Sequence, residues 1–172
     1  FDFDDDQSAF RDTLLEFFEK SSPPAVVRAA EPSGFDRSLW ERTAELGLTS
    51  IAVPTDRGGA GAGLVELAIA AECVGRWLAP VPVVEATTAS TLLASLPSSP
   101  AVDALLERVV EATSIATVAL HPTVDGVARL VPAGAVADVV LALHGDDLIA
   151  VETGGSAPQL TNLGSAPIAD CP

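Results

Sequence analysis

Apolar residues in the first part of the chain recur every three or four positions, the spacing that gives a helix one apolar face. Phe10, Leu14 and Phe18 fall on one such stripe behind an acidic start, and Pro23–Pro24 ends it. The same spacing returns further along the chain. The pattern predicts helices at about residues 4–20, 36–46, 64–78, 84–96 and 102–110.

The third predicted helix, 64–78, carries two apolar rows, which is typical of a helix buried between neighbours. Cys73 lies in the second row and is interpreted as a small hydrophobic residue. Trp40 and Trp77 are interpreted as core or interface anchors. The apolar run 48–54, which Pro54 ends, is predicted to be an extended connector.

The pattern changes after residue 114 to short apolar runs bounded by turn residues, which predicts strands. His144–Asp147 has the composition of a hairpin turn. The expected fold class is α+β: an N-terminal all-α helical domain, residues 1–113, followed by a small, incomplete antiparallel β domain, residues 114–172. Four or five strands are too few for a typical closed barrel. The predicted strands are 115–120, 127–131, 137–143 and 148–151, with one more near the end.

Amino-acid composition excludes several classes of partner. The 172 residues include 9 Lys plus Arg and 24 Asp plus Glu, a formal charge of −15, which argues against nucleic acid and anionic membrane surfaces as partners. No apolar run is long enough to cross a bilayer. Two cysteines, Cys73 and Cys171, are too few for a disulfide framework, which favours the cytoplasm. The absence of methionine suggests a trimmed or partial chain.

Few residues are candidates for catalysis, ligand binding or metal binding. The acids at residues 2–6 are typical of an ordinary helix start, so no metal site is predicted. The glycine-rich run 57–63 is interpreted as a flexible turn, with a close approach to a ligand as the alternative. His121 and His144 stand at strand ends, where a surface or turn position is favoured over a catalytic role.

A set of short motifs runs through residues 39–82. Singly they are unspecific, but together they resemble the N-terminal helical domain of the acyl-CoA dehydrogenases. The resemblance covers residues 1–113 well and 114–151 loosely. The motifs are Trp40, Ala44-Glu-Leu-Gly47, Val53-Pro54, Gly58-Gly-Ala-Gly61, Glu72-Cys-Val-Gly-Arg76 and Ala79-Pro-Val-Pro82.

This resemblance implies a fold with an N-terminal helical domain, a middle β domain and a C-terminal four-helix domain. It implies FAD as cofactor, an acyl-CoA substrate, a place in fatty acid or lipid catabolism, and assembly as an oligomer. In the family, a carboxylate removes the α-proton of the thioester while a hydride passes from the β-carbon to the flavin. The helical domain that normally carries this base has no counterpart here, so no catalytic residue is assigned.

The flavin-binding strand of the family ends in Ala-Leu-Thr-Glu-Pro, with a Gly-Ser after it. Here the matching stretch is Val118-Ala-Leu-His-Pro-Thr123, without the Thr-Glu pair. The cofactor-binding residues that the resemblance implies are Ala119, Leu120, His121 and Thr123.

Three hypotheses stay open at this point. The chain is the front portion of a subunit that dehydrogenates an acyl-CoA with FAD, or a non-catalytic partner subunit that has lost the flavin motif. A weaker third hypothesis is different flavin chemistry on the same fold, such as that of a monooxygenase. The first two predict a homo- or hetero-oligomer with a related subunit, because an incomplete fold exposes apolar helix faces.

Overall fold

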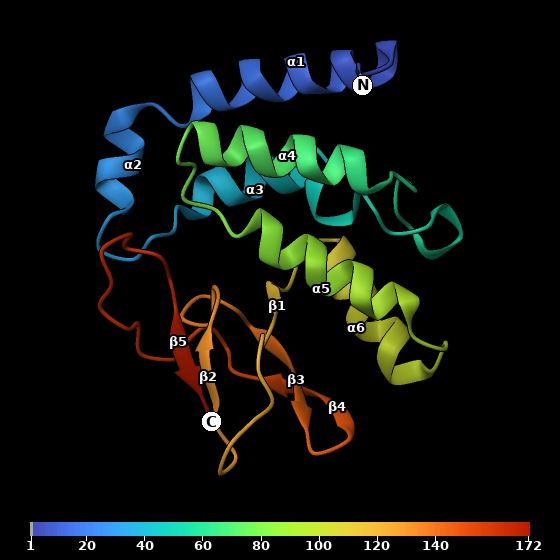
Figure 1. Ribbon diagram of the computed structural model, residues 1–172, viewed down its shortest axis with the longest axis vertical. Helices are drawn as coiled ribbons and strands as arrows, with labels where there is room; N and C mark the ends of the chain where they lie inside the picture. Colours follow the sequence, from blue (N-terminus) through green and yellow to red (C-terminus); the bar gives the residue numbers. More distant parts are fainter. Residues whose placement is uncertain (1) are drawn as a thin grey trace.

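Six α-helices precede the strands in the computed structural model, which describes residues 2–172. The α+β prediction is confirmed, and the helices stack above a small sheet region (Figure 1). The helices are α1 (Asp5–Ser21), α2 (Pro24–Ala30), α3 (Arg37–Glu45), α4 (Leu64–Arg76), α5 (Val83–Ser95) and α6 (Pro100–Val110). None of them is both long and apolar enough to cross a bilayer.

The acidic start of α1 has a local structural use. The Asp4 carboxylate accepts a hydrogen bond from the backbone N–H of Gln7 at 2.8 Å, and the Gln7 side chain accepts one from the N–H of Asp4. This reciprocal capping box satisfies two donors that a helix start leaves open. Within residues 2–172, no group of three or more His, Cys, Asp or Glu side chains is placed to bind a metal ion.

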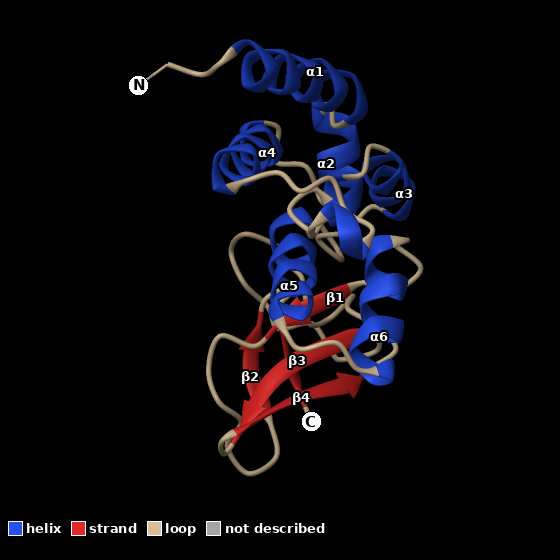
Figure 2. Cartoon of the chain, turned by 90° about the vertical axis from the view of Figure 1, so that its right-hand side faces the viewer, coloured by secondary structure: helices blue, strands red, loops and turns tan. Residues whose placement is uncertain are grey.

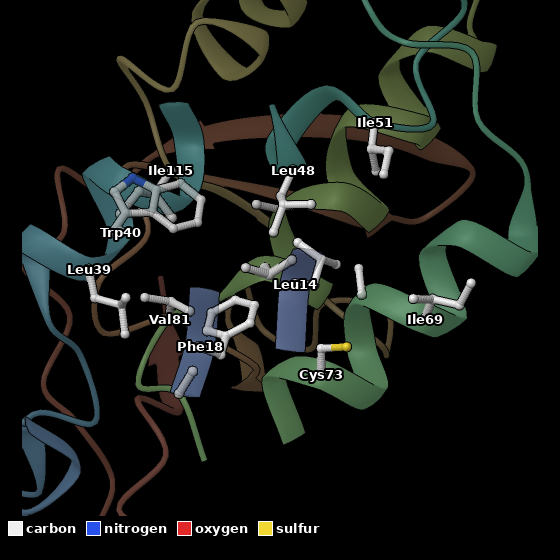
Figure 3. Packing of buried hydrophobic residues seen from close by; sticks show 14 of the residues in the cluster. Leu14, Phe18, Leu39, Trp40, Leu48, Ile51, Ile69, Cys73, Val81 and Ile115 are labelled. Atoms are coloured by element: carbon white, nitrogen blue, oxygen red, sulfur yellow. The ribbon is translucent and has the colours of Figure 1, made fainter. Parts of the chain in front are cut away.

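The helical core forms where α1, α3 and α4 meet the loop after α3. Phe18, Trp40 and Leu48 are at most 1% exposed and lie together (Figure 3). Cys73 packs against the same cluster, as the small hydrophobic residue that the apolar row predicts. Both cysteines are free and buried, and burial raises the pKa of each thiol.

One helix was not predicted, and one local prediction was wrong. The chain after Ser22 forms α2, because Pro24 stands at the first helical position, where its missing N–H costs nothing. The apolar run 48–54 is not extended: Leu48–Ser50 is a 3₁₀ turn (η1), and Thr55–Arg57 is a second one (η2). Gly47, with a φ of 75°, turns the chain into η1.

The strands form two small sheets. The first has the order β1 (Ala116–Val118), β3 (Val139–His144), β4 (Asp147–Glu152), and the second pairs β2 (Ala128–Val131) with β5 (Ala169–Cys171). The predicted hairpin is confirmed, since His144 pairs with Asp147 across the turn in antiparallel register. The sheets are mostly antiparallel, but β1 runs parallel to β3.

The helical and strand parts share a packed junction. Helices α5 and α6 lie against the sheet, with α1 and α4 at the far side (Figure 2). Leu93 of α5 and Val109 of α6 join Val139 and Leu141 of β3 in one buried cluster. The Arg108 guanidinium also donates to Glu152 of β4 at 2.7 Å. The two parts therefore hold each other in place, and surfaces built from both have a defined shape.

Candidate functional site

A hollow of about 500 Å³ opens beside this junction. Its walls come from α2, the end of α4, the start of α5 and the loop between β4 and β5. That loop reaches up from the strands toward α2 in Figure 1. Ligand sites in proteins are commonly concave, mostly apolar and between about 300 and 1,000 Å³. The hollow therefore has the size and the composition of a small-molecule site.

The rim of the hollow carries two exposed leucines, Leu78 and Leu163, which are 71% and 108% exposed. Leu78 also has a φ of 47°, in the left-handed region that favours glycine. It ends α4 in a Schellman arrangement: its N–H donates to the carbonyl of Gly75, and the N–H of Ala79 donates to the carbonyl of Val74. This helix end accounts for the left-handed backbone of Leu78, and its exposed side chain adds apolar surface to the rim of the hollow.

The opposite wall depends on a glycine. Gly34 has a φ of 63°, and a Cβ at this position would overlap the carbonyl oxygen of Ser165 in the β4–β5 loop. It would also lie 2.9 Å from the Cδ of Pro167. The turn between α2 and α3 and the loop 163–167 therefore touch backbone to backbone. This contact closes one side of the hollow.

One partly buried carboxyl group lines the hollow. Glu85 stands in the first turn of α5, and burial raises its pKa. Glu31, exposed at the end of α2, is the other titratable side chain among the lining residues that the structure describes. No Lys, Arg or His of residues 2–172 lines the hollow, so neither carboxylate has a cationic partner there. Sequence reasoning missed Leu78, Glu85 and Leu163, because no motif marks them.

The free energy of unfolding should depend on whether the carboxyl group of Glu85 is protonated. A pKa raised by burial means that the folded chain binds the proton more tightly, so stability falls as the pH rises from the unfolded value of about 4.5 through the folded pKa. Each tenfold difference in proton affinity is worth about 1.4 kcal/mol. We expect Glu85→Gln to gain stability over the wild type as the pH is raised from 4 to 8, measured by urea unfolding. A pH-independent difference would contradict this, and Glu31→Gln, alone and combined with Glu85→Gln, tests the neighbouring acid.

The residues that the resemblance implies for cofactor binding lie elsewhere, on the stretch after β1. Ala119 and Thr123 are tied to β3, since their N–H groups donate to the carbonyls of Leu141 and Leu143, each at 2.8 Å. Leu120 and His121 lie in the exposed turn between them, with Leu120 69% exposed. The structure thus brings the four residues together as one exposed turn.

The side chains of this turn offer little to a flavin. The Thr123 hydroxyl is paired with Nδ1 of His144 at 2.7 Å. Within residues 2–172, the N–H groups of Leu120 and His121 have no hydrogen-bond partner in the protein. The free hydrogen-bond donors of this turn are therefore backbone N–H groups rather than side chains.

A smaller hollow of about 220 Å³ lies beside this turn, between the two sheets. Thr123 and His144 line one side of it, and residues of both sheets line the rest, among them Val140 and Ile149 of the first sheet and Ala128 and Cys171 of the second. Both histidines are exposed, as the surface or turn interpretation predicted.

The glycine-rich run 57–63 is a turn that packs on its own chain. A Cβ at Gly59 would overlap the carbonyl oxygen of Val53, so the close approach that glycine allows here is to backbone. Arg57 extends from this turn to the end of α5, where its guanidinium donates to three carbonyl oxygens, and to Asp103 of α6 at 2.6 Å. The run therefore has a structural role in joining two helices.

Comparison with a family model and comparison with known proteins agree with each other. The family model for the acyl-CoA dehydrogenase N-terminal domain matches residues 4–110. Acyl-CoA dehydrogenase IpdE2 of Mycolicibacterium smegmatis is 31% identical over 160 residues, which are 91% of this chain and 48% of that protein. The chain spans about half the length of the curated relatives it matches.

Two solved structures show the same fold. The ChsE4–ChsE5 complex from Mycobacterium tuberculosis matches with a TM-score of 0.78 at 23% identity, over 93% of this chain and 50% of that one. A variant of the Tcur3481–Tcur3483 steroid ACAD matches with a TM-score of 0.78 at 24% identity, over 96% of this chain and 54% of that one.

Proposed function

The chain belongs to the acyl-CoA dehydrogenase family, and from this premise we propose that it forms part of an enzyme that dehydrogenates an acyl-CoA thioester between its α- and β-carbons with FAD. In this proposal residues 1–113 are the helical domain and residues 114–172 belong to the β domain. The observation that carries the proposal is the hollow of about 500 Å³ where the helices meet the β4–β5 loop.

The hollow suits the acyl part of such a thioester. Its lining includes small and apolar residues such as Ala30, Val74 and Pro82, and the leucines at its rim are free to cover a bound chain. An apolar group that enters it loses contact with water, which contributes about 25 cal/mol for each Å² buried. The nucleotide part of CoA would remain outside, because no basic side chain lines the hollow within residues 2–172.

The turn 119–123 is the part of this chain that we propose to contact FAD. The N–H groups of Leu120 and His121 would donate to it, while Ala119 and Thr123 hold the turn on β3. Bound FAD supplies the acceptor for the hydride that leaves the β-carbon. We assign no residue of this chain as the base that takes the α-proton.

A second candidate function is that of a non-catalytic partner subunit. The observation that favours it is the state of the flavin turn: the Thr123 hydroxyl is occupied by His144, and His121 stands where the family has its Thr-Glu pair. The ChsE4–ChsE5 complex, a structural relative, joins two different proteins. In this alternative the chain supports a flavin-binding homologue and acts through the assembly.

A flavin titration separates the two functions. If the chain is a partner subunit, the purified 172 residues should bind FAD weakly, with a dissociation constant in the micromolar range or above, because the turn offers only backbone donors. A homologous subunit that retains the Thr-Glu pair should bind FAD more tightly by at least about tenfold. The measurement is the change in flavin absorption near 450 nm, a band that belongs to the cofactor itself.

The matched variant is His121→Glu, which restores one residue of the family pattern. Tighter FAD binding in this variant supports the partner-subunit function. Tight binding by the unchanged chain would contradict that function and support a direct catalytic role.

A further inference from the structure

We propose that the open edge of β4 is a docking site for an extended segment of a partner protein. The segment adds a strand antiparallel to β4 and places an apolar side chain in the smaller hollow between the two sheets. It has alternating apolar residues and a basic residue near the β3–β4 turn. The inference goes beyond the proposed function, because it concerns assembly and holds whether or not this chain binds FAD.

The backbone of β4 is open along one side. β4 forms the edge of the first sheet that lies farthest from β1 (Figure 2). The N–H of Thr153, directly after β4, donates to the carbonyl of Asp138, directly before β3. Because the direction of these groups alternates along an antiparallel strand, those of Leu148, Ala150 and Glu152 point away from β3. Within residues 2–172 they have no further backbone partner.

This edge lacks the features by which sheets usually prevent strand addition. Natural edge strands carry a proline, a lysine or a bulge, or they are very short. β4 is six residues long, Asp-Leu-Ile-Ala-Val-Glu, and pairs with β3 without a register shift. Its four central residues, 148–151, are apolar. β4 is therefore a regular template on which another strand can pair.

The hollow of about 220 Å³ gives an added strand a place to bury a side chain. Ile149 and Val151 of β4 line it and are half-buried, and Ala128 and Cys171 of the second sheet line it as well. Residues opposite each other on neighbouring strands share a face, so a strand on β4 would direct every second side chain toward this space. A cavity of about 150 Å³ holds a benzene molecule, so a phenylalanine side chain fits here.

Charge indicates which strand the edge accepts. Asp146 and Asp147 stand at the β3–β4 turn and form no ion pair within residues 2–172, whereas Glu152 at the other end is paired with Arg108 at 2.7 Å. A lysine or arginine opposite Asp147 would therefore stabilise the added strand. A second copy fits less well, because a twofold pairing of β4 with itself sets its terminal acids against each other, and each copy has a formal charge of −15.

The test titrates synthetic peptides into the full 172-residue chain by isothermal titration calorimetry. The reference peptide is acetyl-Lys-Thr-Phe-Thr-Val-Thr-Lys-amide, in which phenylalanine and valine would face the hollow and the threonine N–H groups would face β4. Methylating the three threonine nitrogens should weaken binding by at least about tenfold, because it removes the donors that face β4. Methylating the phenylalanine and valine nitrogens is the matched control and should change binding by less than about twofold.

Two further peptides test the hollow and the charge. Replacing phenylalanine by alanine should weaken binding by at least about fivefold, since it removes the side chain that the hollow buries. Replacing both lysines by glutamate should weaken it by at least about threefold at low salt, and added salt should reduce that difference.

Variants of the protein test the same edge. Ala150→Pro removes an outward N–H and leaves the ladder to β3 in place, so it should weaken the reference peptide by at least about fivefold. Ala150→Val keeps that N–H and should bind the peptide like the wild type. Circular dichroism checks that both variants fold, and the two methylated peptides on the unchanged chain decide the question if Ala150→Pro does not.

Four results would overturn the inference: no binding of the reference peptide, equal effects of the two methylation patterns, equal affinity for the glutamate peptide at low salt, or unchanged affinity when phenylalanine is replaced. Dimerisation of the chain that Ala150→Pro abolishes, measured by sedimentation equilibrium, would also overturn it, because the occupant would then be a second copy. The flavin titration does not depend on any of these outcomes, so the proposed function is tested separately.

Discussion

Replacing Arg57 by alanine should lower the free energy of unfolding by about 2–4 kcal/mol, since hydrogen bonds to charged groups contribute about 1.5–3 kcal/mol each and are not additive. The Arg57 guanidinium donates to the carbonyl oxygens of Leu93, Ala94 and Leu96, at 2.8 to 3.3 Å. These carbonyls lie at the C-terminal end of α5, where helix carbonyls run out of partners along the helix, and the carbonyl of Leu93 also accepts from the N–H of Leu96. The second nitrogen of the guanidinium pairs with Asp103 of α6 at 2.6 Å.

The size of the effect follows from burial. The Arg57 side chain is 18% exposed, so water cannot readily replace it when it is removed. Arg57→Lys should recover little, because an ammonium group cannot hold three carbonyls and a carboxylate in the fixed geometry of a guanidinium.

Urea unfolding followed by circular dichroism gives the comparison. The control is Arg129→Ala, which removes an arginine whose ion pair to Asp170 is exposed and 3.6 Å long, and should change stability by less than about 0.5 kcal/mol. Equal losses in Arg57→Ala and Arg129→Ala would contradict the interpretation that Arg57 joins the two helices.

Helices with a full apolar stripe could be predicted from the sequence, and so could the hairpin after β3. The stripe of Phe10, Leu14 and Phe18 marked α1 because burial on one face has a period that the chain displays directly. The hairpin was visible because His144–Asp147 supplies turn residues between two apolar runs. In both cases the residues that reveal the element are the residues that form it, so a short stretch of sequence is enough to predict it.

The errors arose where a local signal allows two structures. Proline ends one helix and begins another, so Pro23–Pro24 predicted the end of α1 and concealed the start of α2. The apolar run 48–54 has no clear period, and a buried 3₁₀ turn and an extended segment look alike in such a run. The parallel pairing of β1 with β3 depends on how the chain returns across the sheet, which no short motif records.

Part of the candidate site could be predicted from the sequence, and part could not. The turn 119–123 was found because a family pattern runs through it, although its side chains depart from that pattern. The hollow of about 500 Å³ could not be found, since one of its walls depends on the contact between Gly34 and Ser165, which are far apart in the sequence. Leu78 is an ordinary helix residue in the sequence, and only its backbone conformation and exposure distinguish it.

Replacing Gly34 by alanine should separate the β4–β5 loop from the helices and lower the free energy of unfolding by about 2–4 kcal/mol. The positive φ of 63° costs the new side chain about 1 kcal/mol, and the overlap of its Cβ with the carbonyl oxygen of Ser165 adds the rest. Because the blocking atoms belong to backbone, a side-chain rotation cannot relieve the overlap. The loop 163–167 must move away, and one wall of the hollow moves with it.

Gly126→Ala is the matched control for this change. Gly126 has a φ of 76°, and a Cβ there would meet nothing within 4 Å, so this variant bears the conformational cost of about 1 kcal/mol without the overlap. The difference in urea unfolding between the two variants therefore measures the contact between Gly34 and the loop. Limited proteolysis supplies the local reading, since cleavage near Leu163 should become faster in Gly34→Ala and stay unchanged in Gly126→Ala. Equal stability losses with unchanged cleavage would mean that the loop does not depend on this contact, and that the wall of the hollow is held by other parts of the chain.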